Sequence, residues 1–213
     1  MSSTNSSHRV PTSDSKRRDY LHTLLADRAG REWCLFLDRD GVINRRIVDD
    51  YVRSWREFEW LPDAKAALAA LCGWAPHVVV VTNQQGIGKG LMSADSVAHI
   101  HANIQAELAA FGVAVDDFAV CPHLESEHCR CRKPQPGLIL DWLEQHPSCQ
   151  PSLSVMVGDS RSDLELARNV AVTTGGCAGI EIGNADLEDI ADVSFDSLWE
   201  FATAVTHQGV IHE

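Results

Sequence analysis

Four short runs of apolar residues constrain the fold of this chain more than any other feature. Each run is fully apolar, as expected for a strand covered on both faces, and together they occupy residues 34–37, 78–81, 118–120 and 155–157. Stretches with good helix formers and apolar residues three or four apart separate or follow these runs, at residues 64–71, 93–111, 137–145 and 162–169. This alternation predicts an α/β fold, with a parallel sheet that has helices on both faces.

Polar and charged residues directly follow each of the four apolar runs. They occupy residues 38–41, 82–83, 121–123 and 158–163. In a parallel α/β sheet, ligands bind outside the carboxyl ends of the strands. We therefore expect these four segments to meet at one edge of the sheet and to form the functional site.

The first of these segments holds two carboxylates, Asp38 and Asp40, separated by one residue. Buried carboxylates are costly unless a cation or hydrogen bonds compensate for their lost hydration. Mg²⁺ takes oxygen ligands, usually one or two carboxylates, so Asp38 with the distant Asp159 would suit it. A single Asp after a strand is more often a cap or turn former, but four coincident polar strand ends argue against that interpretation here.

The overall charge limits the partners of the chain. A net charge of -12 argues against a sequence-independent grip on nucleic acid, which needs many Lys and Arg residues. No apolar run approaches the roughly 18 to 20 residues of a membrane span, and the first 20 residues lack the apolar region of a signal peptide. A small anionic ligand can still be held by a few placed cations, backbone N–H groups or metal ions. The seven cysteines are an odd number in a chain too large to need disulfides, so we expect a reducing compartment and a cytoplasmic protein.

Taken together, the strand ends resemble the four ordered motifs of the haloacid dehalogenase superfamily. The matching segments are residues 38–43, 82–84, 133–134 and 158–163, and the resemblance spans roughly residues 33 to 165. It implies a Rossmann-like fold with a minimal cap and a magnesium-dependent phosphatase activity. The alternative left open is a binding module that kept the fold without turnover.

The resemblance also implies a role for each matching residue. Asp38 would attack phosphorus and form an aspartyl phosphate, and Asp40 would protonate the leaving alkoxide and then activate water. Thr82 and Lys133 would hold the phosphoryl oxygens. Mg²⁺ would be bound by Asp38, by the backbone carbonyl of Asp40 and by Asp159.

A cluster of soft metal ligands follows the third apolar run. Cys121, His123, Cys129 and Cys131 offer three thiols and one imidazole within 11 residues, a set that suits structural zinc. The spacing differs from common zinc fingers, so buried or redox cysteines remain an alternative, and His128 is a competing ligand. The run from Cys121 to residue 134 resembles the zinc loop of one subfamily, the histidinol-phosphate and D-glycero-D-manno-heptose 1,7-bisphosphate phosphatases, and this implies a structural Zn²⁺ that stiffens the loop.

The choice between these two substrates rests on thinner evidence. Five short segments resemble the heptose branch, at residues 43–44, 50–52, 57–62, 83–87 and 133–137, and the short gap inside the cysteine cluster resembles the histidinol branch. A bisphosphate needs further cations, and the loops offer Arg45, Arg46, Lys89, Arg130 and Arg132. We favour removal of the C7 phosphate of the heptose bisphosphate, with histidinol phosphate as the alternative, for which Glu125 and Glu127 would bind the amine. The residues expected to contact substrate are Asn83, Gln84, Arg132 and Arg46.

The domain organisation is expected to be simple. The 213 residues suffice for one substantial core and are few for two full domains. The first residues are rich in Ser, Thr and charge and offer little to bury. We predict a disordered or weakly ordered arm over residues 1–30 and a single phosphatase domain over residues 31–210.

Overall fold

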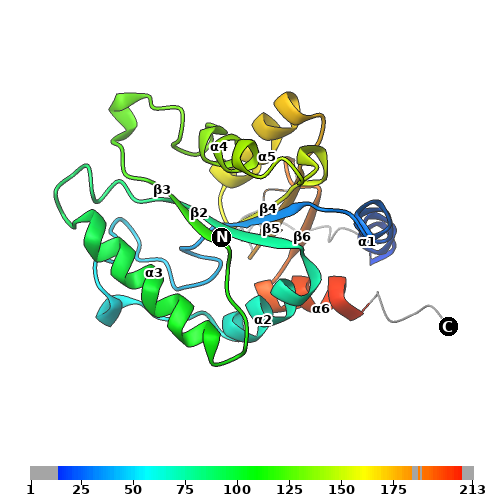
Figure 1. The fold of residues 1–213 in the computed structure, drawn as a ribbon, viewed down its shortest axis with the longest axis horizontal. Helices are drawn as coiled ribbons and strands as arrows, with labels where there is room; N and C mark the ends of the chain where they lie inside the picture. The colour runs from blue at the N-terminus through cyan, green and yellow to red at the C-terminus, as the bar shows by residue number, and fades with distance from the viewer. Residues whose placement is uncertain (1–13, 184–186, 188, 208–213) are drawn as a thin grey trace, which may run out of the picture.

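A six-stranded parallel sheet forms the centre of the molecule (Figure 1). The structure is a computed structural model, and it describes residues 14–183, 187 and 189–207. The strand order is β3-β2-β1-β4-β5-β6, and every neighbouring pair is parallel. The strands are β1 (Cys34–Leu37), β2 (His77–Asn83), β3 (Asp117–Cys121), β4 (Val155–Gly158), β5 (Ala178–Ile182) and β6 (Val193–Phe195).

Helices cover both faces of this sheet, as Figure 1 shows. One face carries α2 (Ala64–Trp74), α3 (Ala94–Ala109) and α6 (Leu198–His207), and the other carries α4 (Gly137–Gln145) and α5 (Arg161–Thr174). Three short 3-10 helices lie in the connections: η1 (Trp55–Glu57), η2 (Glu125–Glu127) and η3 (Pro151–Leu153). None of the helices in the described part of the chain has the length and apolar character needed to cross a bilayer.

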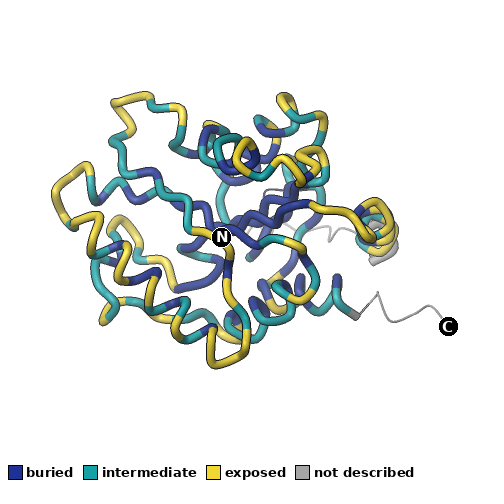
Figure 2. Tube along the Cα trace, in the orientation of Figure 1, coloured by how far each residue is buried: buried dark blue, intermediate teal, exposed yellow. Residues whose placement is uncertain are grey.

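The strands at the centre of the molecule are buried (Figure 2). Their side chains alternate between two hydrophobic cores, one on each face of the sheet. Leu35 and Leu37 of β1 belong to the core beneath α2, α3 and α6. Phe36 belongs to the core beneath α4 and α5, where its ring meets Trp142 edge to face at 5.8 Å. The run at 34–37 is therefore fully apolar because it is buried on both faces, as the sequence suggested.

The N-terminal segment corrects one prediction. Helix α1 (Asp14–Arg28) occupies half of the segment predicted to be a weakly ordered arm, and that prediction is wrong for these residues. Leu21 and Leu24 are buried and join the core beneath α6, while Arg28 donates to the carbonyl oxygens of Leu24 and Leu153. The available signal was the spacing of Leu21 and Leu24, three residues apart, as on one face of a helix. Residues 1–13 of the predicted arm lie outside the described residues.

The strand order reverses direction at the centre of the sheet, between β1 and β4. Chains leaving two adjacent strands in opposite directions open a crevice at the carboxyl ends of those strands. Only a short segment, residues 44–62, with η1 and isolated bridges at Asn44, connects β1 to α2 above this crevice. The cap is therefore minimal, as predicted.

Candidate active site

A cavity of about 400 Å³ lies at the carboxyl ends of β1, β2 and β4. Residues from all the predicted motifs line it, together with residues of the short cap segment. The lining consists of Asp38, Asp40, Arg46, Ile47, Asp49, Asp50, Tyr51, Val52, Thr82, Asn83, Gln85, Lys89, Arg132, Lys133, Asp159, Ser160 and Ser162.

A buried lysine joins the carboxylates at the floor of the cavity. Lys133 Nζ lies 2.7 Å from Asp38 Oδ1 and 2.7 Å from Asp163 Oδ1, and it donates to the Val81 carbonyl oxygen at 3.1 Å. These contacts use the three donors of the ammonium group. Although burial lowers the pKa of Lys133, the charges of Asp163 and Asp38 outweigh it and raise the pKa well above its ordinary value. Lys133 is therefore a fixed positive charge beside Asp38.

The carboxylates around Asp38 form a set that fits a divalent cation. Oxygens of Asp38, Asp159 and Asp163 lie within 4.8 Å of one another, and Asp159 Oδ1 is buried with no hydrogen-bond partner among the described residues. Burial raises the pKa of Asp38, with Lys133 opposing the effect, and burial together with Asp163 raises that of Asp159 to about 6. Raised pKa values of this kind are typical of clustered, buried carboxylates, and a divalent cation would stabilise their ionised forms.

Two of these three carboxylates are better placed than Asp163 to serve as metal ligands. Asp163 Oδ2 accepts hydrogen bonds from the Ser160 backbone N–H at 3.1 Å and from the Ser160 hydroxyl at 2.5 Å. Asp163 therefore holds the turn that begins α5, in addition to contacting Lys133. Asp38 and Asp159 remain, with oxygen chemistry that suits Mg²⁺.

Asp40 is held from three sides. Arg39 Nη2 donates to both of its oxygens, at 3.0 and 2.9 Å, while Asn44 Nδ2 donates at 2.9 Å and Gln84 Nε2 at 2.8 Å. Burial alone would raise the pKa of Asp40, but the Arg39 charge and these hydrogen bonds outweigh it and lower the pKa. The carboxylate of Asp40 is therefore fixed in orientation by partners on three sides.

The residues at the carboxyl end of β2 take different positions. Thr82 lines the cavity, and its hydroxyl oxygen accepts a hydrogen bond from Gln84 Nε2 at 2.8 Å. Asn83 also lines the cavity, but its amide exchanges two hydrogen bonds with the backbone of Lys133. Gln84 is buried behind Asp40 and is not part of the lining. Gln84 thus holds Asp40 and Thr82, which differs from the substrate contact that the sequence suggested.

A glycine is required where the segment after β1 approaches the segment after β4. Gly41 has φ +102°, and a Cβ atom there would lie 1.9 Å from Asp159 Oδ2. Any side chain at this position would displace the carboxylate that fits the metal. The glycine after Asp40 is therefore part of the site's geometry.

Three of the five cations proposed from the sequence reach the rim. Arg46, Lys89 and Arg132 line the cavity, and Arg132 Nη1 is buried without a partner among the described residues. Arg46 lies 3.8 Å from Asp159. By contrast, Arg45 pairs with Glu59 and Arg130 with Asp141, and both lie outside the lining.

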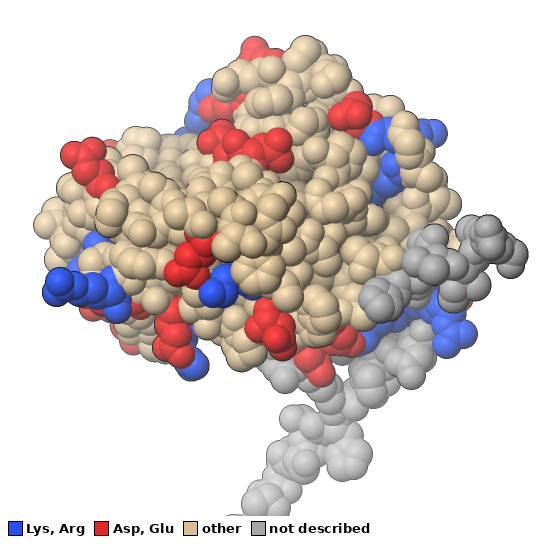
Figure 3. Space-filling model, turned by 60° about the horizontal axis from the view of Figure 1, so that its bottom comes forward, with Lys and Arg blue, Asp and Glu red and all other residues tan. Residues whose placement is uncertain are grey.

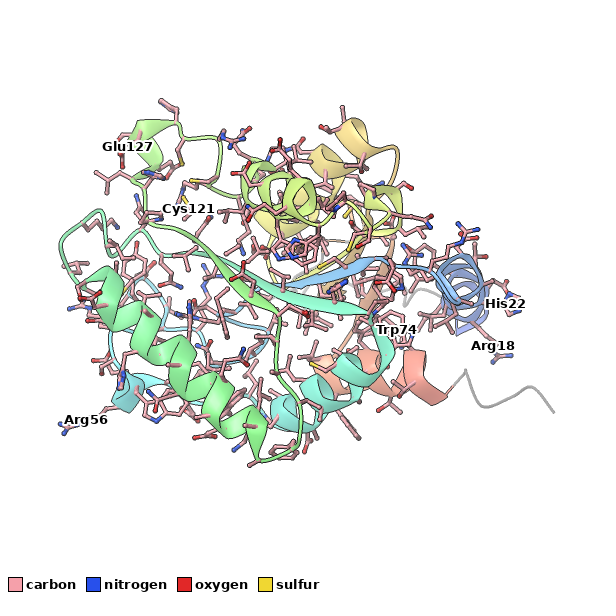
Figure 4. All side chains as sticks on the ribbon, in the orientation of Figure 1. Arg18, His22, Arg56, Trp74, Cys121 and Glu127 are labelled. Atoms are coloured by element: carbon pink, nitrogen blue, oxygen red, sulfur yellow. The ribbon has the colours of Figure 1, made fainter. Side chains whose placement is uncertain are left out.

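The predicted cysteine cluster also comes together. Figure 4 shows Cys121 at the end of β3 and Glu127 at the outer turn of the same loop. The Sγ atoms of Cys121, Cys129 and Cys131 are 3.2 to 3.6 Å apart, and His123 Nδ1 is 3.0 Å from Cys131 Sγ. Sulfur ligands of a tetrahedral zinc, each at about 2.3 Å from the metal, lie roughly 3.8 Å apart. The four residues can therefore hold one metal ion with no position left for substrate.

Sequence reasoning missed the residues that support Asp40 from behind. Arg39 and Asn44 are fully buried, and His101 of α3 lies within reach of Arg39. The position of Arg39 between two carboxylates was the available signal. His101 gave none, because a histidine in a helix is more often exposed.

Comparison with known proteins identifies the family. A family model described as HAD-hydrolase-like matches residues 130–199. The D-glycero-alpha-D-manno-heptose-1,7-bisphosphate 7-phosphatase of Mycobacterium tuberculosis is 62% identical over 86% of this chain and 97% of its own length. The D-glycero-beta-D-manno-heptose-1,7-bisphosphate 7-phosphatase of Rhodopseudomonas palustris is 37% identical over 68% of this chain and 82% of its own.

A solved structure agrees with these relatives. It is the D,D-heptose 1,7-bisphosphate phosphatase from B. bronchiseptica, in complex with magnesium and phosphate. The similarity has a TM-score of 0.73 at 31% identity and covers 83% of this chain and 99% of that one. The chain therefore belongs to the haloacid dehalogenase-like hydrolases, in the subfamily of the heptose-1,7-bisphosphate phosphatases.

Proposed function

We propose that this phosphatase removes the C7 phosphate of D-glycero-α-D-manno-heptose 1,7-bisphosphate. The observation that most supports a bisphosphate is the arrangement of charge in the cavity: Asp38 and Lys133 lie at its floor, and Arg46, Lys89 and Arg132 at its rim. One phosphate would lie at the floor for reaction, and the rim cations would hold the other. The 62% identical relative is named for the α anomer and the 37% identical one for the β anomer, which favours the α form here.

The reaction proposed for the floor residues has two steps. A carboxylate oxygen of Asp38 forms a bond to phosphorus while the bond from phosphorus to the C7 oxygen breaks, and Asp40 in its protonated form gives its proton to that oxygen. Water then attacks the phosphorus of the aspartyl phosphate and gives one proton to Asp40, while the bond from phosphorus to the Asp38 oxygen breaks, so that inorganic phosphate leaves and the Asp38 carboxylate is restored. Thr82 and Lys133 hold phosphoryl oxygens throughout.

Mg²⁺ is the metal that we propose for the floor of the cavity. Asp38, Asp159 and the backbone carbonyl of Asp40 would hold it, and it would offset the negative charge of phosphate and carboxylates. The unpartnered Asp159 Oδ1 supports this assignment.

Histidinol phosphate is the less favoured substrate. Glu125 and Glu127, the carboxylates considered for its amine, lie in η2 outside the cavity lining. Glu127 also accepts a hydrogen bond from the Leu124 backbone N–H. No carboxylate of the zinc loop is thus placed to meet an amine in the cavity, among the residues that the structure describes.

The substrate assignment is tested by comparing kcat/KM for the α and β heptose bisphosphates and for histidinol phosphate. We expect the α-bisphosphate to exceed the β form by about tenfold and histidinol phosphate by more, because histidinol phosphate lacks the second phosphate that the rim cations would bind. Equal or greater kcat/KM with histidinol phosphate would reject the heptose assignment, and preference for the β form would reject the anomer.

Arg132→Ala tests the rim directly. We expect KM for the heptose bisphosphate to rise about 10- to 100-fold, the equivalent of losing one charge-assisted contact. KM for the heptose 7-monophosphate, which lacks the second phosphate, should change less than threefold. Arg130→Ala is the matched control, because Arg130 lies in the same loop but pairs with Asp141, and its kinetics should match those of the wild type.

We also propose a structural Zn²⁺ at Cys121, His123, Cys129 and Cys131. The loop that these residues close leads directly to Arg132 and Lys133, so it would place both cations. The wild-type protein should contain about one zinc per chain by metal analysis. Cys131→Ser should lose the zinc and at least about tenfold in kcat/KM, whereas Cys72→Ser, outside the cluster, should lose neither. A zinc-free wild-type protein with full activity would contradict this assignment.

We infer a small-molecule partner in a reducing compartment, consistent with a cytoplasmic location. All seven cysteines are free thiols. On the face in Figure 3, acidic and basic side chains lie in small mixed groups, with no continuous basic surface there for a nucleic acid backbone.

A further inference from the structure

A buried arginine and a buried histidine lie behind Asp40, and the reaction described above gives neither of them a role. Arg39 is fully buried, although it follows the nucleophile Asp38 directly. Its Nη2 contacts both oxygens of Asp40, and its Nη1 lies 3.3 Å from His101 Nε2. One guanidinium thus joins β1 to helix α3 beneath the site.

The contact with His101 can be formed in only one way. Arginine has donors and no acceptor, so Nε2 of His101 must accept and the ring must be neutral. Burial and the Arg39 charge lower the pKa of His101 to about 3, which agrees with a neutral ring. The ring is itself fixed, because it stacks on Phe118 of β3 with centroids 4.2 Å apart. His101 is therefore a rigid acceptor for Arg39.

The consequence concerns the orientation of Asp40. Asn44 and Gln84 contact Asp40 as neutral donors, and Arg39 is its one cationic partner among the described residues. Without an acceptor for Nη1, the guanidinium would lose a buried hydrogen bond and could turn away from Asp40. A displacement of about 1 Å in the position of a proton donor is enough to lower the rate of the catalysed step substantially.

We propose that Arg39 and His101 are positioning residues that fix Asp40 for proton transfer to the leaving group. This inference rests on the proposed function in assigning that transfer to Asp40. It does not depend on the sugar, because every phosphate monoester with a basic leaving oxygen needs the same proton. It predicts that substituting either residue lowers kcat/KM more for a substrate whose leaving group is more basic.

The test compares His101→Leu with His101→Gln on a series of aryl phosphates. The series runs from phenyl phosphate, whose leaving group needs a proton, to 2,4-dinitrophenyl phosphate, whose leaving group does not. The parameter is kcat/KM, which reports on steps up to phosphoryl transfer to Asp38. We expect His101→Leu to lower kcat/KM for phenyl phosphate about 10- to 100-fold and for the dinitrophenyl ester less than threefold. His101→Gln, which retains an acceptor, should recover at least half of the loss on a logarithmic scale.

Controls separate positioning from a general defect. His99→Leu changes an exposed histidine of the same helix and should leave both substrates unaffected. Thermal unfolding identifies any variant that fails to fold, in which case Arg39→Lys carries the same comparison and must show the same dependence on the leaving group. An equal loss on both esters in a folded variant, or no loss on either, would overturn the inference. Hydrolysis of both esters by the wild type, even without activity on the heptose, keeps this test separate from that of the substrate.

Discussion

Asp38→Asn is expected to lower kcat by about four orders of magnitude or more on every phosphate monoester. The amide cannot form the acyl phosphate, so the two-step route is closed and only binding and charge stabilisation remain. The fold should persist, because asparagine has the same shape and Lys133 keeps its contacts with Asp163 and the Val81 carbonyl. The measurement is phosphate release from a generic aryl phosphate, with and without Mg²⁺, together with urea unfolding.

Asp49→Asn is the matched control for that substitution. Asp49 also lines the cavity but is exposed and makes no contact with Lys133, so its kcat should stay within about threefold of the wild type. If the wild type shows no magnesium-dependent hydrolysis and Asp38→Asn changes nothing, the chain is a binding module and the phosphatase assignment fails. A similar loss of kcat in both variants would indicate that Asp38 acts through the negative charge of the cavity and not as a nucleophile.

The sequence predicted the central strands well because burial on both faces leaves a pattern that needs no tertiary context. The run at 34–37 is strand β1 with the same bounds, and helix α4 has the predicted bounds of 137–145. The parallel order then brings the strand ends together, so Asp38, Thr82 and Asp159 meet as expected. The apolar pattern of the strands and the polar residues at their ends thus predict the same site.

The outer strands β5 and β6 escaped prediction because their patterns are weaker. β5 contains Gly179 and the buried Glu181, which accepts a hydrogen bond from the Ser194 hydroxyl of β6 at 2.5 Å. A Cβ atom at Gly179 would lie 3.3 Å from Ala167 Cβ, so the glycine lets α5 lie close to the strand. Neither feature is visible in a single sequence, since both depend on partners distant along the chain.

The roles around Asp40 could not be predicted for the same reason. The position of Gln84 two residues after Thr82 suggests that its side chain enters the cavity. In the structure, this side chain turns back and donates to Asp40 and Thr82. His101 comes from α3, 61 residues beyond Asp40, and no local pattern joins them. Motif order predicts which residues react, whereas the residues that contact them from behind become visible only in three dimensions.

Lys133→Met is expected to lower the free energy of unfolding by about 3 to 5 kcal/mol and to abolish most of the activity. The substitution leaves Asp38 and Asp163 buried without the ammonium group between them, and a buried ion pair that loses one partner costs that much. Urea unfolding in the presence of a chelator, at neutral pH, measures the effect. Lys65→Met provides the comparison, because Lys65 makes a similar contact with Glu107 at 2.9 Å but is partly exposed, so about 1 kcal/mol or less should be lost.

A second substitution identifies the cause of that loss. Lys133→Met combined with Asp163→Asn removes one of the two stranded charges, so the double variant should unfold at a higher urea concentration than Lys133→Met alone. Activity should not return, because the phosphoryl oxygens still lack their cation. If Lys133→Met costs no more than Lys65→Met, or if Asp163→Asn adds its own loss to that of Lys133→Met, the ammonium group does not hold these carboxylates together. The recovery of stability without recovery of activity would separate the two roles of Lys133, charge compensation in the folded protein and phosphate binding in the reaction.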